Sequence, residues 1–311
     1  MGKIAFLFDG QGSQYAGMSR DIYENVKEVH DFFGVAEAIR PGTLTQMFAG
    51  SEEELKQTDN TQPLVFLSDI AAALALRAGG VHPDAVAGFS LGETVALTES
   101  GVLSKEKAFK LVCKRGSLMQ EAATATKGAM VAVLKMDKKE LEKACKKYEV
   151  YPVNYNCPGQ IVVSGEEKKI EKFTAFLDEQ KVRYAKLAVG GSFHTPYMKT
   201  AMEGLKEELR TNKLYNINKS DIPIYSNKTA KCYPDSADEM IDTFSEQVVS
   251  SVQWENTLLN MDKDGVDTFI ECGPGKTLAG FVKRTLPKAR IFSVTDMTSL
   301  ENTLKELEKD A

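Results

Sequence analysis

The chain has 311 residues, of which 42% are hydrophobic and 27% charged, and its formal net charge is −5. This composition is typical of a globular protein and gives no reason to expect binding to nucleic acid or to an anionic membrane. The length exceeds that at which one compact core usually stops growing, so we expect two domains, or one large domain with an insertion.

The cysteines indicate a reducing compartment. Five are scattered along the chain without the C-x-x-C spacing of a metal or redox site: Cys113, Cys145, Cys157, Cys232 and Cys272. An odd number of scattered thiols fits a cytosol. The first segment, KIAFLF, has the pattern of a strand and not of a signal peptide, and the longest apolar stretch, near residues 70–78, is too short to span a bilayer. We therefore expect a cytoplasmic protein without a membrane segment or a metal.

Short apolar runs alternate with amphipathic ones in the first and last parts of the chain. KIAFLF (3–8) leads into a glycine turn, and AVAGFS (85–90) leads into a helical pattern at 93–100. Near the end, a strand pattern from residue 267 ends in a Gly-Pro-Gly turn and is followed by a helical pattern at 276–285. This alternation predicts parallel strands joined by helices, an α/β fold.

The middle of the chain has a different order of predicted strands and helices. Strands are predicted at 128–135, 150–156, 160–164 and 183–189, and helices at 138–147 and 166–180. The order strand, helix, strand, strand, helix, strand is that of a ferredoxin-like (βαββαβ) unit. We predict a small ferredoxin-like subdomain, residues 127–192, inserted in a large α/β-hydrolase-like domain formed by residues 1–126 and 193–311.

Ser90 lies at the centre of the segment GFSLGE, between a predicted strand and a predicted helix. Gly88 and Gly92, two residues before and after it, complete the pattern of a nucleophile elbow, in which side chains at these flanking positions would collide. The segment therefore predicts a serine nucleophile. The alternative is a structural strand-to-helix turn that carries a serine.

A serine hydroxyl needs a base to accept its proton, and the chain has three histidines. His30 lies in a polar stretch and His82 in a turn, so we expect both at the surface. His194, in GGSFHTPYM, follows the last strand of the inserted unit and is the best candidate for the base. More than one hundred residues follow it. Ordinary α/β-hydrolases place this histidine late in the chain, so its position disfavours that class.

Two other glycine-rich segments fail as nucleotide-binding motifs. In GQGSQ, Tyr15 occupies the place of the third glycine of a dinucleotide fingerprint, and in the GPGKT segment Ile270 occupies that of the first glycine of a P-loop. A glycine turn after the first strand can instead direct a backbone N–H at a reacting carbonyl, as an oxyanion hole requires.

Seven segments, in order along essentially the whole chain, resemble the malonyl-CoA:acyl carrier protein transacylases: FDGQGSQ, GFSLGE, KRGSLMQEA, NYNCPGQIVVSG, SFH, QVVSSVQWENT and ECGPGKTLAG. The resemblance implies transfer of a malonyl group from malonyl-CoA to the phosphopantetheine thiol of an acyl carrier protein. It implies a ping-pong mechanism through a malonyl-serine, with CoA and phosphopantetheine thioesters as substrates, no bound cofactor, and a monomeric chain.

The resemblance also assigns roles to matching positions. It implies that Ser90 attacks the thioester, and that His194 removes its proton and later returns one to the departing thiol. A backbone carbonyl at the position of Gln247 would orient the histidine, so no acid is needed. The backbone N–H groups of Gln11 and Leu91 would form the oxyanion hole.

Arg115, in KRGSLMQ, matches the arginine that holds the free carboxylate of the malonyl group. A planar guanidinium grips a carboxylate with two parallel hydrogen bonds, which a lysine cannot reproduce. Such a clamp favours an acyl group with a carboxylate over acetyl, and it favours transfer over hydrolysis because it holds the ester until a thiol arrives. Without the resemblance, an arginine in a helix is expected at the surface.

Three positions bear on specificity or depart from the family pattern. Phe89 stands where the family usually has histidine, and Asp9 stands where it usually has proline. Phe89 neither titrates nor forms side-chain hydrogen bonds, so it affects pocket polarity and acyl specificity. Phe193 matches the bulky position with which polyketide acyltransferases exclude a methyl branch, and it predicts malonyl over methylmalonyl.

Other functions fit the same residues less well. The nearest alternative is a discrete acyltransferase or acyl hydrolase serving a polyketide synthase. A binding module without activity, which would dock a carrier protein, is disfavoured because both Ser90 and His194 are present.

Overall fold

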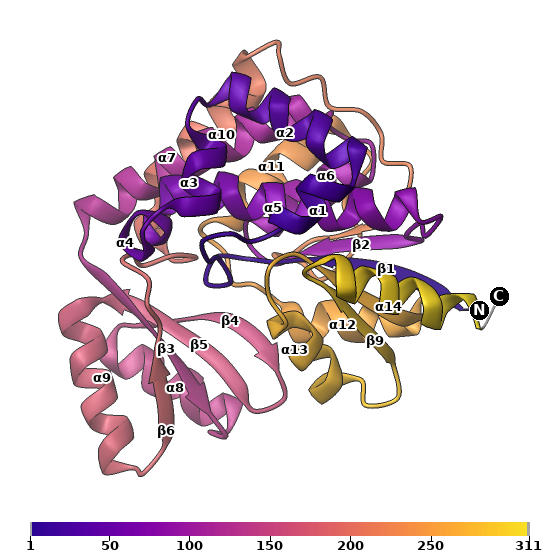
Figure 1. The fold of residues 1–311 in the computed structure, drawn as a ribbon. Coiled ribbons are helices and arrows are strands. Elements are labelled where there is room, and N and C mark those ends of the chain that lie inside the picture. Colours follow the sequence, from indigo (N-terminus) through magenta and orange to yellow (C-terminus); the bar gives the residue numbers. More distant parts are fainter. Residues whose placement is uncertain (1, 310–311) are drawn as a thin grey trace.

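The computed structural model describes residues 2–309, which form two sheets (Figure 1). The larger sheet has the strand order β7-β2-β1-β8-β9, and each neighbouring pair is parallel. Its strands are β1 (Lys3–Phe8), β2 (Ala85–Gly88), β7 (Ile224–Tyr225), β8 (Val266–Cys272) and β9 (Arg290–Val294). Because the strands are parallel, their carboxyl ends meet at one edge, where α/β proteins usually bind ligands.

Helices cover both faces of this sheet, which explains why its strands read as nearly continuous apolar runs. Alternate residues of β1 belong to two cores: Phe6 and Phe8 to one, Ala5 and Leu7 to the other. Helices that contribute to the first core are α1 (Arg20–Asn25), α2 (Lys27–Ile39), α3 (Thr43–Ala49), α4 (Glu52–Lys56), α5 (Thr58–Ala78), α6 (Gly92–Glu99), α7 (Lys105–Ala125), α10 (Lys199–Thr211), α11 (Ala237–Gln247) and α14 (Met297–Glu308). Those of the second core are α12 (Trp254–Lys263) and α13 (Thr277–Thr285).

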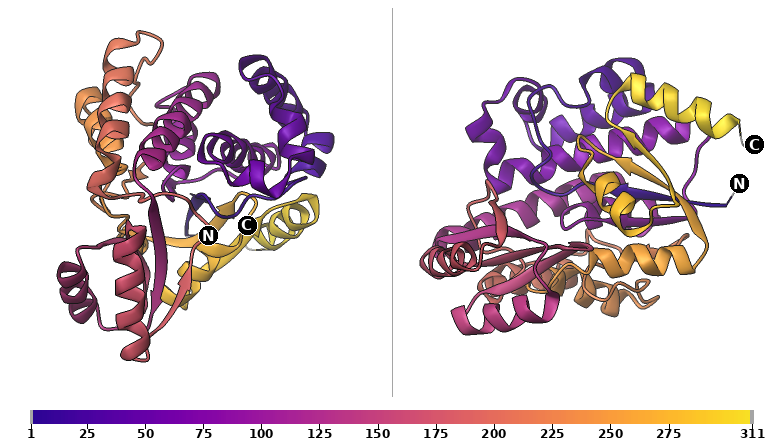
Figure 2. Two further views of the ribbon diagram at one scale, coloured as in Figure 1. Left: turned by 90° about the vertical axis from the view of Figure 1, so that its left-hand side faces the viewer. Right: turned by 90° about the horizontal axis from the view of Figure 1, so that it is seen from below.

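The smaller sheet is antiparallel, with the order β4-β5-β3-β6. Its elements are β3 (Gly128–Leu134), α8 (Lys138–Tyr148), β4 (Tyr151–Cys157), β5 (Gln160–Glu166), α9 (Glu167–Glu179) and β6 (Arg183–Lys186). Helices α8 and α9 pack on one face of this sheet, as the further views in Figure 2 show. The order and pairing are those of a ferredoxin-like unit.

A backbone bridge joins the small sheet to a loop that packs beside the large one. Val252, in the segment after α11, bridges to β4 at Asn154, and its carbonyl accepts a hydrogen bond from the Tyr155 N–H. After β6 the chain returns through a loop and a short 3₁₀ helix (Pro196–Met198) to α10. The loop that carries His194 therefore lies at the junction of the two sheets.

The predicted fold class is confirmed: the chain is α/β, with a parallel sheet and an inserted βαββαβ unit. The prediction of a strand through residue 189 was wrong at its end, because β6 ends at Lys186, after which one backbone hydrogen bond, from the Leu187 N–H to the Met130 carbonyl, still joins the chain to β3. The division into domains at residues 127 and 192 stays a prediction. No helix in the described range is long and apolar enough to cross a membrane.

Candidate active site

Ser90 occupies a sharp turn between β2 and α6. Its φ is +54°, a left-handed conformation that is costly for a residue with a side chain and is typical of strained functional turns. A Cβ on Gly88 would lie 1.9 Å from the Gly92 carbonyl carbon, and one on Gly92 would lie 2.4 Å from the Phe8 carbonyl oxygen. Only glycine fits at either position, so the local sequence dictates the turn that exposes the serine.

His194 meets Ser90 at the carboxyl edge of the large sheet. The Ser90 Oγ lies 2.9 Å from the His194 Nε2. On the other side of the ring, Nδ1 lies 3.1 Å from the carbonyl oxygens of both Gln247 and Ser250. Carbonyl oxygens only accept hydrogen bonds, so Nδ1 carries the proton and Nε2 presents its lone pair to the serine hydroxyl.

The His194 ring is held neutral. Burial and then the positive charge of Arg115 lower the pKa of His194 to about 4, against the smaller opposing effect of the two carbonyl hydrogen bonds. A neutral imidazole with a free Nε2 is the form that a general base requires. The arrangement therefore activates a serine without a carboxylate partner on the histidine.

Arg115 lies on α7 and is fully buried, contrary to the expectation for an arginine in a helix. Its Nη1 donates to the Gln62 Oε1 at 2.7 Å, and its Nη2 donates to the Gln247 Oε1 at 2.8 Å and to the Ser90 Oγ at 3.4 Å. Burial lowers the pKa of Arg115 to about 10, so the side chain stays charged at neutral pH. A cation is thus fixed beside the nucleophile.

A cavity of about 70 Å³ contains these reacting groups. Residues from both sheets line it: Gln11, Gln62, Phe89, Ser90, Leu91, Arg115, Met119, Met130, Asn154, Leu187, Val189, Phe193 and His194. The structure therefore brings seven of the eight predicted site residues to one cavity. The eighth, Gln247, touches the site through Arg115 and His194.

Phe89 and Phe193 form apolar parts of the cavity wall. The Phe89 ring packs edge-on against Trp254, with centroids 5.3 Å apart, and lies 6.3 Å from the Phe281 ring. Phe193 is 6% exposed. The residue in the usual histidine position is therefore part of an aromatic cluster beneath the nucleophile, and no proton moves through it.

A larger hollow of about 590 Å³ adjoins the cavity. The two share Gln11, Leu187 and Val189. Lys56 and Lys186 also line the larger hollow. The small cavity with the reacting groups therefore shares part of its wall with a larger hollow.

Sequence reasoning missed four residues of the site. Gln62 holds Arg115, Ser250 holds the histidine, and Asn227 and Glu93 form a buried network under Ser90. Glu93 was visible as the last residue of GFSLGE. Ser250 lies in the matching segment QVVSSVQWENT, three residues after the position to which the resemblance assigns the orienting carbonyl. Gln62 and Asn227 carry no local signal, because each contact joins segments far apart in the chain.

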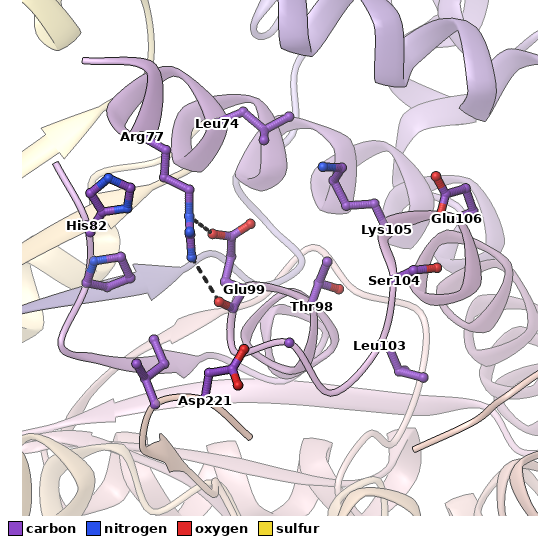
Figure 3. A pocket seen from close by; sticks show the side chains of 13 residues that line it. Leu74, Arg77, His82, Thr98, Glu99, Leu103, Ser104, Lys105, Glu106 and Asp221 are labelled. Atoms are coloured by element: carbon purple, nitrogen blue, oxygen red, sulfur yellow. Dashed lines mark hydrogen bonds and ion pairs between the residues drawn. The ribbon is translucent and has the colours of Figure 1, made fainter. Parts of the chain in front are cut away.

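A separate hollow of about 610 Å³ lies near the amino end of β2 (Figure 3). Its charged side chains include Arg77, which pairs with Glu99 at 2.8 Å, and Asp221. Ser90 follows the carboxyl end of β2, so this hollow is at the opposite edge of the sheet. Within the described residues no cluster of three or more His, Cys, Asp or Glu side chains could hold a metal.

Comparisons with known proteins agree with this geometry. The family model described as acyl transferase domain matches residues 5–308. The chain is 38% identical to the malonyl CoA-acyl carrier protein transacylase of Bacillus subtilis, over all of this chain and 99% of the relative. It is 34% identical to that of Staphylococcus aureus, over 97% of this chain and 98% of the relative.

Solved structures show the same fold. The malonyl CoA-acyl carrier protein transacylase of Clostridium perfringens has a TM-score of 0.93 at 38% identity, with 99% of this chain and 98% of that one covered. A malonyl-transacylase in complex with its type II polyketide synthase acyl-carrier protein has a TM-score of 0.92 at 32% identity, with 98% and 99% covered. The chain therefore belongs to the acyl transferase family, in the group of the malonyl-CoA:acyl carrier protein transacylases.

Proposed function

We propose that the chain transfers a malonyl group from malonyl-CoA to the phosphopantetheine thiol of an acyl carrier protein through a malonyl-Ser90 intermediate. The observation that carries this proposal is the buried Arg115 guanidinium beside the Ser90 hydroxyl. Its hydrogen-bond partners within residues 2–309 are all neutral groups. The buried Glu93 carboxyl acts on this cation electrostatically but does not hydrogen-bond to it. A buried guanidinium whose hydrogen bonds go to neutral groups favours an acyl group that brings its own carboxylate.

In the first half-reaction, Ser90 Oγ attacks the thioester carbonyl of malonyl-CoA while His194 Nε2 accepts the hydroxyl proton. A bond forms between Oγ and the carbonyl carbon, the bond from that carbon to sulfur breaks, and the proton passes from Nε2 to the CoA thiolate. The 2.9 Å contact between Oγ and Nε2 supports direct proton transfer.

The developing oxyanion is assigned to the backbone N–H groups of Gln11 and Leu91. Gln11 follows β1 and Leu91 follows Ser90, and both line the cavity that contains the nucleophile. Donors fixed in advance around a growing negative charge are usually the largest electrostatic contribution to acyl transfer.

The second half-reaction repeats these steps with the carrier-protein thiol. The thiol gives its proton to His194 Nε2, its sulfur attacks the malonyl ester, and the proton returns to the Ser90 Oγ as the ester bond breaks. The adjoining hollow of about 590 Å³ is assigned to the pantetheine arm of each substrate in turn, and its Lys56 and Lys186 favour the phosphate groups.

Transfer is favoured over hydrolysis by the same clamp. Arg115 holds the malonyl carboxylate of the acyl-enzyme, which keeps the ester in one orientation until a thiol arrives. The relatives described above are transacylases by name, which also favours transfer. Phe193 is assigned to the exclusion of a methyl branch, and Phe89 to the apolar floor beneath the reacting carbonyl.

Two further points belong to this proposal. The five cysteines are free and scattered, which supports a cytoplasmic location. The reaction needs no redox or electrophilic group beyond the side chains and backbone groups described, so the thioester substrates are assigned as its small-molecule requirements.

The kinetic pattern tests the function. Initial rates with malonyl-CoA and holo-acyl carrier protein varied together should give parallel double-reciprocal lines, and Ser90→Ala should lower the rate by at least about 10³-fold. Release of free malonate as fast as malonyl transfer would support a hydrolase instead. Unimpaired transfer by Ser90→Ala would contradict the mechanism.

A further inference from the structure

The buried side chain of Asn227 holds the strained turn at the nucleophile. Asn227 is fully buried, in the loop after β7. Its Oδ1 accepts a hydrogen bond from the Ser90 N–H at 2.7 Å, and its Nδ2 donates to the Gly88 carbonyl at 2.6 Å. One amide therefore bridges the two sides of the elbow, and it satisfies two backbone groups that the turn leaves without strand or helix partners.

The bridging amide is itself anchored to the elbow helix. The backbone N–H of Asn227 donates to the Glu93 Oε1 at 2.9 Å, and its carbonyl accepts from the Gln253 N–H at 2.8 Å. Glu93 lies three residues after Ser90, in the first turn of α6, and is fully buried. The contacts form a closed ring: Glu93 in α6 holds Asn227, and Asn227 holds Ser90, the residue from which α6 continues.

A second side chain fixes the other backbone group of the serine. Gln247 Nε2 donates to the Ser90 carbonyl at 2.7 Å. Both backbone groups of Ser90 are therefore hydrogen-bonded, the N–H to Asn227 and the carbonyl to Gln247 and to the Glu93 N–H. No group within residues 2–309 accepts a hydrogen bond from the following N–H, that of Leu91. The Ser90 N–H is thus used to hold the turn, whereas the Leu91 N–H is left to bind a substrate.

We propose that Asn227 is a positioning residue of acyl transfer, anchored by Glu93, which fixes the elbow so that the Ser90 hydroxyl faces His194 and the Leu91 N–H faces the reacting carbonyl. This inference rests on the proposed function, since it concerns the rate of forming the acyl-serine. It adds a requirement to that mechanism: the nucleophile's φ of +54° is maintained by the amide and not by the glycines alone.

The test measures acylation in a single turnover, by rapid quench of excess enzyme with malonyl-CoA. Asn227→Ala should lower the acylation rate constant by about 10²-fold, as a displacement of about 1 Å does to an aligned nucleophile. It should leave the Kd of malonyl-CoA within about threefold, because the residue does not touch the donor. If Asn227 had only a structural role, Asn227→Ala would lower the unfolding midpoint, but the acylation rate constant would not fall while the Kd stays the same.

Asn260→Ala is the matched control. The Asn260 Nδ2 donates to the Ala230 carbonyl at 2.8 Å, so it also ties the loop after β7 through a side-chain amide, but it makes no contact with the elbow. Its acylation rate constant should equal that of the wild type even where its unfolding midpoint falls.

A second pair keeps the proposal testable if Asn227→Ala does not fold. Glu93→Gln retains an oxygen that accepts the Asn227 N–H, whereas Glu93→Leu removes it. Glu93→Gln should acylate at least about tenfold faster than Glu93→Leu, because the leucine leaves the buried Asn227 N–H without an acceptor and so loosens the residue that holds Ser90.

The outcomes separate this inference from the function on which it rests. Wild-type enzyme that forms no malonyl-Ser90 would overturn both. Wild-type enzyme that forms it, with Asn227→Ala acylating at the wild-type rate or with equal rates for the two Glu93 variants, would overturn the positioning role and leave the function in place.

Discussion

Arg115 and His194 approach the same oxygen from different directions: the Arg115 Nη2 lies 3.4 Å and the His194 Nε2 2.9 Å from the Ser90 Oγ. The cation that is assigned to the substrate carboxylate therefore also acts on the base. It helps to keep the imidazole neutral, and it stabilises negative charge on the serine oxygen as the proton leaves.

This arrangement predicts that Ser90 stays reactive down to an unusually low pH. The pKa of His194 is lowered to about 4, so the base is neutral above that pH and becomes protonated below it. The rate at which a fluorophosphonate labels Ser90, measured after rapid pH jumps, should be constant from pH 7 to about pH 5 and fall as the pH passes through about 4. An inflection near 6.5, the ordinary histidine value, would contradict this account.

Two variants separate the causes of that shift. Arg115→Met removes the second-largest cause, so the inflection should move to higher pH, and burial should still hold it below the ordinary value. His82→Gln is the matched control: His82 is exposed and lies at the opposite edge of the sheet, so the profile should not change.

The carboxylate clamp predicts a donor-specific loss in Arg115→Lys. A lysine keeps the charge but loses the paired hydrogen bonds, each of which is worth about 1.5–3 kcal/mol to a charged partner, so kcat/KM for malonyl-CoA should fall roughly 10- to 100-fold. The much slower reaction with acetyl-CoA should change far less. Arg210→Lys, on the exposed face of α10, should alter neither donor. Equal losses for the two donors would show that Arg115 does not contact the carboxylate.

Phe193 predicts the choice between malonyl and methylmalonyl donors. The ring lines the small cavity together with Met119 and Met130, so there is little room for a branch. Phe193→Ser should raise the ratio of kcat/KM for methylmalonyl-CoA to that for malonyl-CoA by roughly tenfold, the scale set by one methyl-sized group. The two donors are compared in one competition assay with carrier protein. A ratio equal to that of the wild type would remove Phe193 from the specificity account.

A buried acid predicts how stability changes with pH. Burial, with the negative charges of Asp9 and Glu271, raises the pKa of Asp69 well above its ordinary value. A carboxyl whose folded pKa exceeds its unfolded one binds more protons in the native state. The free energy of unfolding is therefore lost as pH rises from about 4, by at most about 1.4 kcal/mol per pH unit.

Asp69→Asn should remove this loss. Urea unfolding between pH 5 and 8 should give a variant whose midpoint is higher than that of the wild type at pH 8 and depends less on pH. Asp31→Asn is the contrasting variant, because the contact with Lys27 lowers the pKa of Asp31. Its urea midpoint at pH 8 should be lower than that of the wild type, not higher. Parallel pH profiles for wild type and Asp69→Asn would refute the assignment.

The sequence alone predicted the fold class and the parts of the site that depend on local sterics. Gly88 and Gly92 predict the elbow because no other residue fits at either position. The strand before the elbow and the helix after it are predicted by the spacing of their apolar residues. The apolar run at positions 187–189 predicts a continued strand, yet β6 ends at Lys186, and Leu187 and Val189 line the cavity instead.

The supporting network was not predictable from one sequence. Asn227 lies 137 residues from the serine that it holds, and Gln62 lies 53 residues from Arg115. Such contacts are set by how the strand ends and helices meet, and an isolated asparagine or glutamine has no pattern that reveals a distant partner. The burial of Arg115 is similar: apart from the family resemblance of KRGSLMQ, nothing in the helix sequence distinguishes this arginine from one at the surface.

Mass spectrometry of the acyl-enzyme tests the central claim most directly. Enzyme mixed with malonyl-CoA, digested and mapped should carry one malonyl group on the peptide that contains Ser90, and the group should disappear when holo-acyl carrier protein is added, with malonyl-carrier protein as the product. Acetyl-CoA should give far less adduct, and Ser90→Ala none. Malonyl-carrier protein formed by wild-type enzyme without any modified Ser90 peptide would contradict the account.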